Sequence, residues 1–349
     1  MITQDGTAAM ALKKPVFDFE RKPLPVIVAA NYKGGVGKTT TSRILVQGLA
    51  NFPEYNQGKP ILYIDLDPQG NTGLRWNLLE QVDESGFKTP RPHPELVKMG
   101  EEVTRSSICD LWLDLLNEGD PLEPFPYPSN TGELLEELGL IAKDSSQPVG
   151  SDLIHIVPND ETRLIHMQSF RPNTKPAMEA ASVLREWLRS PELAEKYSFV
   201  VIDTPPTRTS VIDLAIHAAT HIYIPFVPEP QSVDGVLSMI SYFQTKVSER
   251  RESNDVPLHF LGMLANIYQK NILIHQQQIK RLEVSQISEH LLPVKLSRAV
   301  SFPETDNWRN TPNQVFANAG SKSATEATRF VKMLAMKVMK DRDEWERIK

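Results

Sequence analysis

The sequence has very little cysteine and no long apolar run. Cys109 is the single cysteine in 349 residues, which rules out an internal disulfide and is typical of proteins from a reducing compartment. No apolar stretch approaches the roughly 20 residues that a membrane-spanning helix needs, and residues 1–21 are polar and carry no signal-peptide core. We therefore expect a cytoplasmic protein that has no membrane partner.

Excess positive charge is also missing. Lys and Arg number 38 against 44 Asp and Glu, a net charge of −6, so composition alone does not indicate a polyanion-binding protein. The charge is unevenly distributed. Residues 270–340 contain eleven Lys and Arg against five Asp and Glu, whereas residues 75–150 contain six against fifteen. This asymmetry suggests two surfaces with different partners, although solvated faces also vary in charge.

What the sequence does have is a glycine-rich loop between a strand pattern and a helix pattern, in the stretch VIVAANYKGGVGKTTT at residues 26–41. Glycines let the backbone turn sharply and point its N–H groups at an anion, and the following helix adds its own N-terminal amides. Lys38 is expected to reach the β- and γ-phosphates of a nucleotide, and Thr39 to hold Mg²⁺. The predicted nucleotide-binding residues of this loop are Lys33, Gly34, Gly35, Val36, Gly37, Lys38, Thr39 and Thr40.

The spacing of this loop departs from the ordinary P-loop. The pattern G-x-x-x-x-G-K-[ST] requires glycine at position 32, where this chain has Tyr32, and a second lysine, Lys33, follows. The loop resembles the deviant Walker A motif of the ParA/MinD family of P-loop ATPases. The resemblance implies that Lys33 crosses a dimer interface to the nucleotide of the other subunit. The nitrogenase iron protein shares this loop but needs several cysteines, which this chain lacks.

Strand and helix patterns alternate along most of the chain. They predict an α/β fold with a doubly wound, mostly parallel sheet and helices on both faces, as in a P-loop NTPase. A short apolar piece at 292–296 precedes a loop. We expect strands at 26–30, 60–67, 153–157, 197–203, 221–227 and 260–267, and helices at 38–50, 177–195, 232–247, 272–290 and 324–339.

The expected plan is one ATPase domain over residues 26–340, with an N-terminal arm at 1–25 and a C-terminal tail at 341–349. The arm is too short for the helix-turn-helix domain that some ParA relatives carry before the P-loop. Residues 75–150 interrupt the pattern with eight prolines and are predicted to form an acidic insertion built onto the core. A solvated lobe and a partner-binding role both remain open for this insertion.

Three aspartates end predicted strands. In a doubly wound sheet the ligand lies beyond the carboxyl ends of the strands, so Asp65, Asp67 and Asp203 are expected to converge on the glycine-rich loop. By resemblance, Asp203 is the Walker B aspartate that holds the Mg²⁺ shell through water, and Asp67 orients or activates the attacking water. Asp65 supports the metal or the loop, and a loop-capping role would serve it equally well.

The resemblance also suggests a site for the base of the nucleotide, at Asn266 and at Pro228 and Pro230 of a Pro-Glu-Pro loop. An Asn side chain both donates and accepts hydrogen bonds, which suits an adenine edge. Asn266 as a cap of the turn before its helix, and Pro228-Glu-Pro230 as a strand terminator, are the alternatives.

The resemblance implies a Mg²⁺-dependent ATPase that is slow and partner-stimulated and that dimerises with ATP. By resemblance it would bind nonspecific DNA, associate with the nucleoid and partition a plasmid or chromosome with a centromere-binding (ParB-type) protein. In the simpler account, Lys332, Lys337 and Lys340 form the solvated face of a helix whose apolar residues pack inward. The candidate DNA contacts are Arg298, Lys322, Arg329, Lys332, Lys337 and Lys340.

The alternative function is a MinD-like membrane-cycling or cargo-positioning ATPase that uses a C-terminal amphipathic helix. Residues 324–339 have some amphipathic character. The chain ends DRDEWERIK, which is not the basic tail that an anionic leaflet favours. We therefore rank this alternative second.

Overall fold

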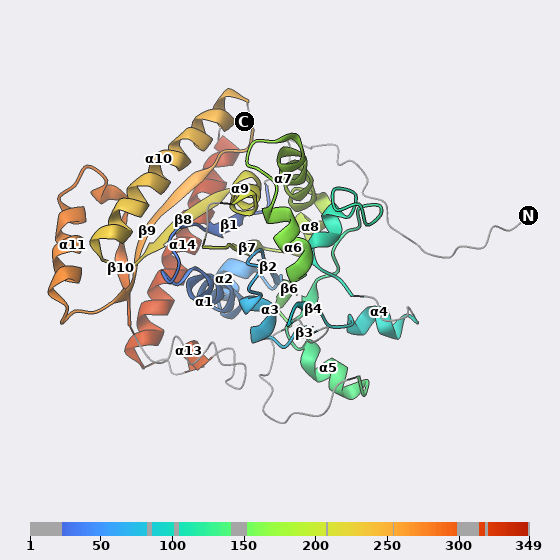
Figure 1. Cartoon of the computed structure of the whole chain (residues 1–349). Coiled ribbons are helices and arrows are strands. Elements are labelled where there is room, and N and C mark those ends of the chain that lie inside the picture. The colour runs from blue at the N-terminus through green and yellow to red at the C-terminus, as the bar shows by residue number, and fades with distance from the viewer. Residues whose placement is uncertain are drawn as a thin grey trace, which may run out of the picture.

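The computed structural model contains one sheet of eight strands, in the order β10-β9-β8-β1-β7-β2-β6-β5 (Figure 1). All neighbouring strands are parallel except β5 and β6, so the expected mostly parallel sheet is confirmed. The structure describes residues 23–81, 86–100, 105–140, 152–206, 209–253, 255–298, 314–317 and 320–347. The strands are β1 Val26–Ala29, β2 Ile61–Asp65, β5 Tyr127–Pro128, β6 Ile154–Val157, β7 Phe199–Asp203, β8 His221–Phe226, β9 His259–Tyr268 and β10 Leu291–Ser297.

Helices cover both faces of the sheet, and the alternation of side chains along the strands explains why. In β1, Val26 and Val28 belong to one buried apolar cluster, and Ile27 and Ala29 belong to the other. The second cluster packs on α1 and α14, and the first on α6, α7, α9 and α10. The helices are α1 Lys38–Asn51, α2 Pro53–Asn56, α3 Asn71–Arg75, α4 Pro94–Lys98, α5 Thr131–Glu137, α6 Glu161–Gln168, α7 Lys175–Leu188, α8 Pro191–Lys196, α9 Ser210–Ala218, α10 Pro230–Glu252, α11 Leu273–Glu283, α13 Gln314–Ala317 and α14 Lys322–Arg347, with short 3-10 turns η1 Ile108–Trp112 and η2 Ser288–His290.

Several elements differ from the expectation. The helix expected at 177–195 is broken into α7 and α8 because Pro191 starts a new helix, with the Ser190 side chain accepting from the Leu193 amide. The apolar piece at 292–296 is an edge strand, β10, paired in parallel with β9. Helix α14 runs to Arg347, so the described part of the expected tail continues this helix. Each edge strand contains a proline, Pro128 in β5 and Pro293 in β10.

The expected insertion is partly built into the core. Strand β5 extends the main sheet, and η1 is buried with Trp112, whose indole N–H donates to the Ala180 carbonyl at 3.0 Å. A separate antiparallel hairpin pairs β3 Leu79–Gln81 with β4 Lys88–Pro90. The remainder of the insertion at 82–85, 101–104 and 141–150, and the arm at 1–22, lie outside the described residues. Among the helices that the structure describes, none is long and apolar enough to cross a bilayer.

The close contact of α1 with α14 yields a stability prediction. A Cβ at Gly48 would lie 2.6 Å from a methyl group of Val331, so Gly48→Ala must push the two helices apart. We expect it to lower the free energy of unfolding by about 1–3 kcal/mol. Gly235 in α10 has open space at its Cβ position, so Gly235→Ala is expected to stabilise the fold by about 0.4–1 kcal/mol. Urea unfolding of both variants checks this, and equal effects would contradict it.

Candidate nucleotide-binding site

The glycine-rich loop connects β1 to α1 at the carboxyl edge of the sheet. Gly35 and Gly37 have φ angles of 71° and 83°, the left-handed region in which a side chain is strained. Gly37 is the N-cap residue of α1, and Lys38 is its first helical residue. The loop therefore brings backbone amides and a helix N-terminus together, which is the arrangement that binds phosphate.

Asn266 braces this loop from the end of β9. Its side-chain amide donates to the Val36 carbonyl at 2.8 Å, and a Cβ at Gly37 would overlap the same amide nitrogen. A second asparagine acts similarly, because the Asn31 amide donates to the Pro225 carbonyl at 2.8 Å. The side chain predicted to read the base is thus engaged with the loop backbone.

The two lysines of the loop occupy different positions. Lys38 is buried and its ammonium donates to the Lys33 carbonyl at 3.2 Å, so it spans the space that phosphates would fill. Burial lowers the pKa of Lys38, while Asp203 and Asp67 act to raise it. The Lys33 side chain is 32% exposed and forms an ion pair with Glu229 at 3.4 Å. At the position of the missing glycine, Tyr32 packs its ring against Tyr242 of α10, with centroids 6.2 Å apart.

The three aspartates converge as expected, and their hydrogen bonds separate their roles. Asp65 and Asp203 are directly paired residues of neighbouring strands β2 and β7. Asp65 accepts from the amides of Asp67 at 3.0 Å and Gly73 at 3.3 Å, so it caps the loop that follows β2. Asp203 accepts from the Thr204 amide at 3.1 Å and the Thr72 hydroxyl at 3.4 Å. The loop-capping alternative for Asp65 therefore describes its contacts.

The buried negative charge of these three carboxylates would be stabilised by a nearby cation. Burial, followed by the charge of Asp67, raises the pKa of Asp203 to about 7, and a hydrogen bond from Thr39 partly offsets this. Burial raises the pKa of Asp67, and burial and Asp203 raise that of Asp65 well above its usual range. Mg²⁺ binds through one or two carboxylates plus phosphates and water. The Asp203 carboxylate and the Thr39 hydroxyl beside it are oxygen donors of this kind. Within the described residues, no group of three or more His, Cys, Asp or Glu is arranged to hold a metal.

A cavity of about 770 Å³ extends from the glycine-rich loop towards α11. Its lining near α11 includes Ile267 of β9, Ile272 of the β9–α11 connection and Ile274 of α11, with Gln269 and His275 beside them. Ile267 has a φ of 52°, a strained value for a β-branched residue. Val227 and Glu229 line the cavity, whereas Pro228 and Pro230 do not, and Pro230 is the first residue of α10. The Pro-Glu-Pro segment thus contributes its middle residue.

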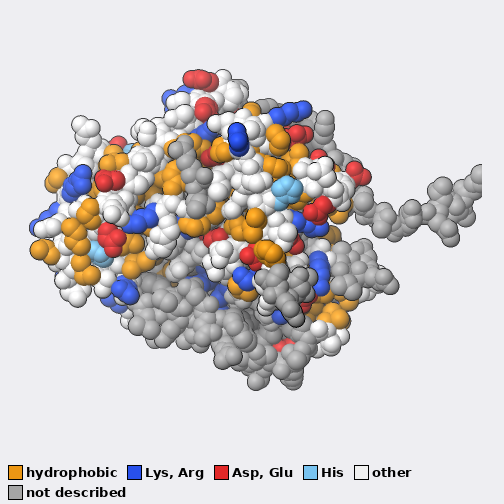
Figure 2. Space-filling view, in the orientation of Figure 1, with side chains coloured by type: hydrophobic (Ala, Val, Ile, Leu, Met, Phe, Trp, Pro, Cys, Tyr) orange, Lys and Arg blue, Asp and Glu red, His pale blue; other side chains and the backbone are white. Residues whose placement is uncertain are grey.

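The six candidate DNA-binding residues do not form one patch. Arg298 lines the nucleotide cavity, and Lys322 lies near it at the start of α14, since Glu326 contacts both Lys322 and Ser297. Lys340 lies at the opposite end of α14, where the adjacent Asp341 approaches His221 and His259, the first residues of β8 and β9. On the face seen in Figure 2, Lys and Arg side chains are scattered among other residues.

Two of these six side chains contact elements other than their own, while Lys322 and Lys340 pair within α14 with Glu326 and Glu344, at 3.6 and 3.7 Å. The Lys337 ammonium donates to the Leu261 carbonyl at 2.8 Å, so the side chain is directed at β9. Lys332 pairs with Glu54 at 3.1 Å and lies over the Phe52 ring. Lys322, Arg329 and Lys340 are exposed, as is Arg298. The inward direction of Lys337 departs from the expectation that it faces DNA.

Sequence reasoning missed four side chains around this site. Arg43 of α1 and Arg75 of α3 are each 2% exposed. Burial and the charge of Arg75 lower the pKa of Arg43 to about 9, and Asp203 partly offsets this. Asn159, after β6, donates its amide to the Asp67 carbonyl. Lys88 of the β3–β4 hairpin donates to the Gln69 carbonyl at 3.2 Å. None belongs to a local motif, so only their position in the fold reveals them.

Comparison with known proteins identifies the family. The model of the AAA domain family matches residues 24–113 and 144–255, more than half of the chain. The chain belongs to this family, in its ParA/MinD type. Residues 114–143 of the expected insertion lie outside the match.

Two relatives of this ParA-type chain are named for chromosome partitioning. The chromosome-partitioning ATPase Soj of Thermus thermophilus is 27% identical over 286 residues, which covers 80% of this chain and 86% of Soj. The chromosome partitioning protein ParA of Caulobacter vibrioides is 25% identical over 289 residues, with 80% and 85% covered.

Solved structures share the fold. A plasmid partition protein of Borrelia burgdorferi bound to AMPPNP aligns with a TM-score of 0.57 at 18% identity, covering 90% of this chain and 100% of that chain. McdA of Cyanothece in complex with ATP aligns with a TM-score of 0.56 at 16% identity, covering 90% and 97%. The P-loop fold expected from the sequence is thereby confirmed.

The brace between Asn266 and the loop yields a binding prediction. Gly35→Ala and Gly37→Ala each force a left-handed alanine, which costs about 1–2 kcal/mol. At Gly37 the new methyl group also overlaps the Asn266 amide, whereas at Gly35 it meets nothing within 4 Å. We expect Gly35→Ala to weaken nucleotide binding by about 5–30-fold and Gly37→Ala to abolish it. Titration with a fluorescent ATP analogue measures both, and equal affinities would refute the role of the brace.

Proposed function

We propose that this chain is a Mg²⁺-dependent ATPase that dimerises with ATP, binds nonspecific DNA and partitions a plasmid or chromosome with a centromere-binding (ParB-type) protein. The observation that carries the proposal is Lys33. It is a second lysine in a phosphate-binding loop where Lys38 already spans the phosphate position, and its side chain is partly exposed. Relatives named for chromosome partitioning support this choice of cargo.

Within one subunit, hydrolysis would depend on positioning and charge rather than on covalent chemistry. The loop amides and Lys38 hold the phosphates, and Asp67 orients the attacking water. Asp203 and Thr39 hold the Mg²⁺ shell, and the ion supplies charge neutralisation at the phosphate oxygens. Because Asp67 lies in a loop fixed by Asp65 and Asn159, its carboxylate is held at the phosphate end of the site. We expect turnover to be slow until the partner protein stimulates it.

Lys33 would act in the dimer. In the single chain it pairs with Glu229, and an exposed ion pair of this kind contributes about 0–1 kcal/mol. A triphosphate carries far more negative charge than one carboxylate. The nucleotide of a second subunit can therefore displace Glu229, so that dimerisation follows ATP binding and reverses after hydrolysis.

For DNA we propose Arg298 and Lys322, which lie at or near the nucleotide cavity, together with the exposed Arg329 further along α14 and Lys340 towards the other end of that helix. Lys332 and Lys337 contribute less, because each is held against another element: Lys332 by Glu54 of α2 and Lys337 by the Leu261 carbonyl of β9. Lys322 and Lys340 instead pair with Glu326 and Glu344 of their own helix. A dimer presents each group twice, so binding would depend steeply on salt. This activity would place the protein on the nucleoid.

The membrane-cycling alternative is weakened by the packing of α14. Its apolar residues Phe330, Val331, Leu334 and Val338 are each 0% exposed in the core. The helix would have to leave the sheet to present this stripe to lipid. Sedimentation with DNA and with anionic liposomes, each in ATP, ADP and no nucleotide, separates the two functions. We expect ATP-dependent binding to DNA; binding to liposomes and not to DNA would contradict our proposal and favour the membrane-cycling function.

The division of roles between Lys38 and Asp67 yields a kinetic prediction. Lys38→Ala removes the buried cation of the phosphate site, so we expect no ATP binding. Asp67→Ala leaves the cradle intact but removes the water-orienting group, so we expect ATP-dependent dimers and at least a 100-fold loss of turnover, on the scale of general-base catalysis. Light scattering and phosphate release measure the two properties. Normal turnover by Asp67→Ala would remove Asp67 from this role.

The proposed DNA-binding residues yield a second prediction. Lys322→Glu and Arg329→Glu are expected to weaken ATP-dependent DNA binding and to reduce the salt slope by about 1 for each phosphate that is no longer neutralised. Their ATP affinity should stay normal. Lys175→Glu, an exposed lysine on α7, makes the same charge change at another position and serves as control. DNA affinity that is unchanged, or lowered equally by the control, would refute this DNA-binding surface.

A further inference from the structure

The β3–β4 hairpin of the insertion packs directly on the loop that carries Asp67. Leu79 of β3 fills the space left by two glycines after β2, since a Cβ at Gly70 would lie 2.6 Å, and one at Gly73 2.7 Å, from its side chain. Figure 1 shows β3 and β4 close to α3, the helix that follows this loop. The fit is therefore close, and the hairpin supports the loop by direct packing.

Lys88 of β4 makes the polar contact of this packing. Its ammonium donates to the backbone carbonyl of Gln69 at 3.2 Å, while the backbone N–H of Gln69 donates to the Asp67 carboxylate at 3.1 Å. Within the loop at residues 67–70, Gln69 is thus bonded both to Lys88 of the hairpin and to the Asp67 side chain. Burial raises the pKa of Asp67, and the backbone hydrogen bond from Gln69 and the charges of Lys38 and Lys88 partly offset this.

The backbone of Lys88 is itself fixed. Its amide donates to the Glu161 carboxylate at 3.1 Å, and the neighbouring Thr89 hydroxyl donates to Asp160 at 2.9 Å. Asp160 is the N-cap of α6 and accepts from the Arg163 amide. The side chain of Lys88 is consequently anchored at its base and directed at the loop.

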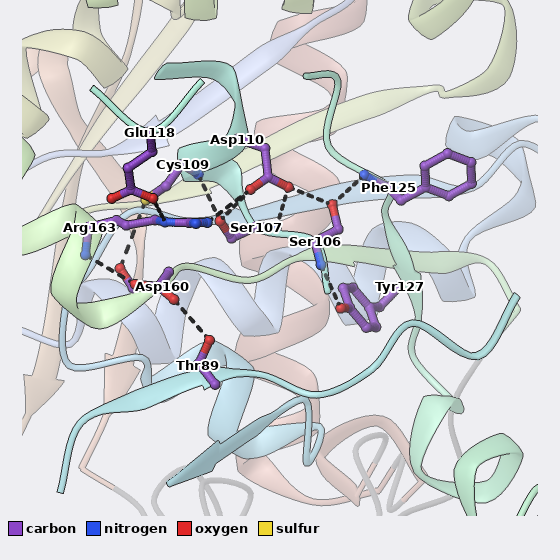
Figure 3. Close-up of polar contacts among 10 residues, drawn as sticks. All are labelled: Thr89, Ser106, Ser107, Cys109, Asp110, Glu118, Phe125, Tyr127, Asp160 and Arg163. Atoms are coloured by element: carbon purple, nitrogen blue, oxygen red, sulfur yellow. Dashed lines mark hydrogen bonds and ion pairs between the residues drawn. The ribbon is translucent and has the colours of Figure 1, made fainter. Parts of the chain in front are cut away.

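Arg163 extends this anchor into the rest of the insertion. Figure 3 shows its guanidinium between Asp110 and Glu118, with contacts of 3.4 and 2.7 Å. Asp110 in turn accepts from Ser106 and Ser107. The hairpin is thus connected through α6 to a buried polar network of the insertion.

We propose that Lys88 is a positioning residue for ATP hydrolysis, through which the insertion holds the Asp67 loop in its working geometry. This inference rests on the proposed ATPase function. It gives the hairpin a role in the rate of hydrolysis and leaves nucleotide binding to the glycine-rich loop. Lys88 acts on Gln69 and Asp67 and need not touch the nucleotide.

The test compares the steady-state ATPase rate of the full chain with those of Lys88→Met and Lys88→Arg. Lys88→Met keeps the apolar stem but removes the charge, so we expect kcat to fall on the order of 10-fold while KM for ATP stays within about twofold. Lys88→Arg keeps the donor and is expected to restore most of the rate. A merely structural role would not produce this split with rescue by arginine.

Lys98→Met, an exposed lysine on α4 of the same insertion, is the matched control and should leave kcat and KM unchanged. An unchanged kcat for Lys88→Met would overturn the inference, as would a rise in KM that accounts for the whole effect. Failure of Lys88→Arg to recover activity would also overturn it. If the wild-type chain itself showed no turnover with DNA and Mg²⁺-ATP, that result would contradict the proposed ATPase function, and a result for Lys88 alone would not.

Discussion

Burial of like charge at the carboxyl edge of the sheet is the constraint on which the site depends. Asp65 and Asp203 are paired residues at the ends of β2 and β7, and Asp67 lies two residues after Asp65, in the loop that follows β2. Three carboxylates so placed repel one another and lose hydration, so their pKa values rise. Lys38 and Arg43 supply opposite charge at this edge.

The sequence predicted what local patterns control. The strand–loop–helix at the P-loop and the strand-end positions of Asp65 and Asp203 follow from runs of apolar residues, glycines and chain direction, and the structure has them as expected. Strand β10 was missed because LLPVKLS contains a proline and gains its partners only beside β9. The break at Pro191 was missed because the apolar pattern continues across it.

The contacts of individual side chains were less predictable. Asn266 lies at the expected strand end, but its amide donates to Val36, a residue 230 positions earlier in the chain. Lys88 and Asn159 reach the Asp67 loop from the hairpin and from the end of β6, which no spacing rule connects to it. Such contacts are tertiary, since they depend on which strands become neighbours. The same reason explains why Lys337, on a solvated-looking helix, is directed inward.

The two prolines at the sheet edges limit how copies of this chain assemble. An edge strand offers unpaired N–H and C=O groups to a neighbouring molecule, and proline removes one of the donors. Pro128 lies in a two-residue strand at one edge and the exposed Pro293 at the other. Sheets of separate molecules are therefore poor partners for each other at both described edges. The dimer that we propose would form through the nucleotide face, where this limit on strand addition does not apply.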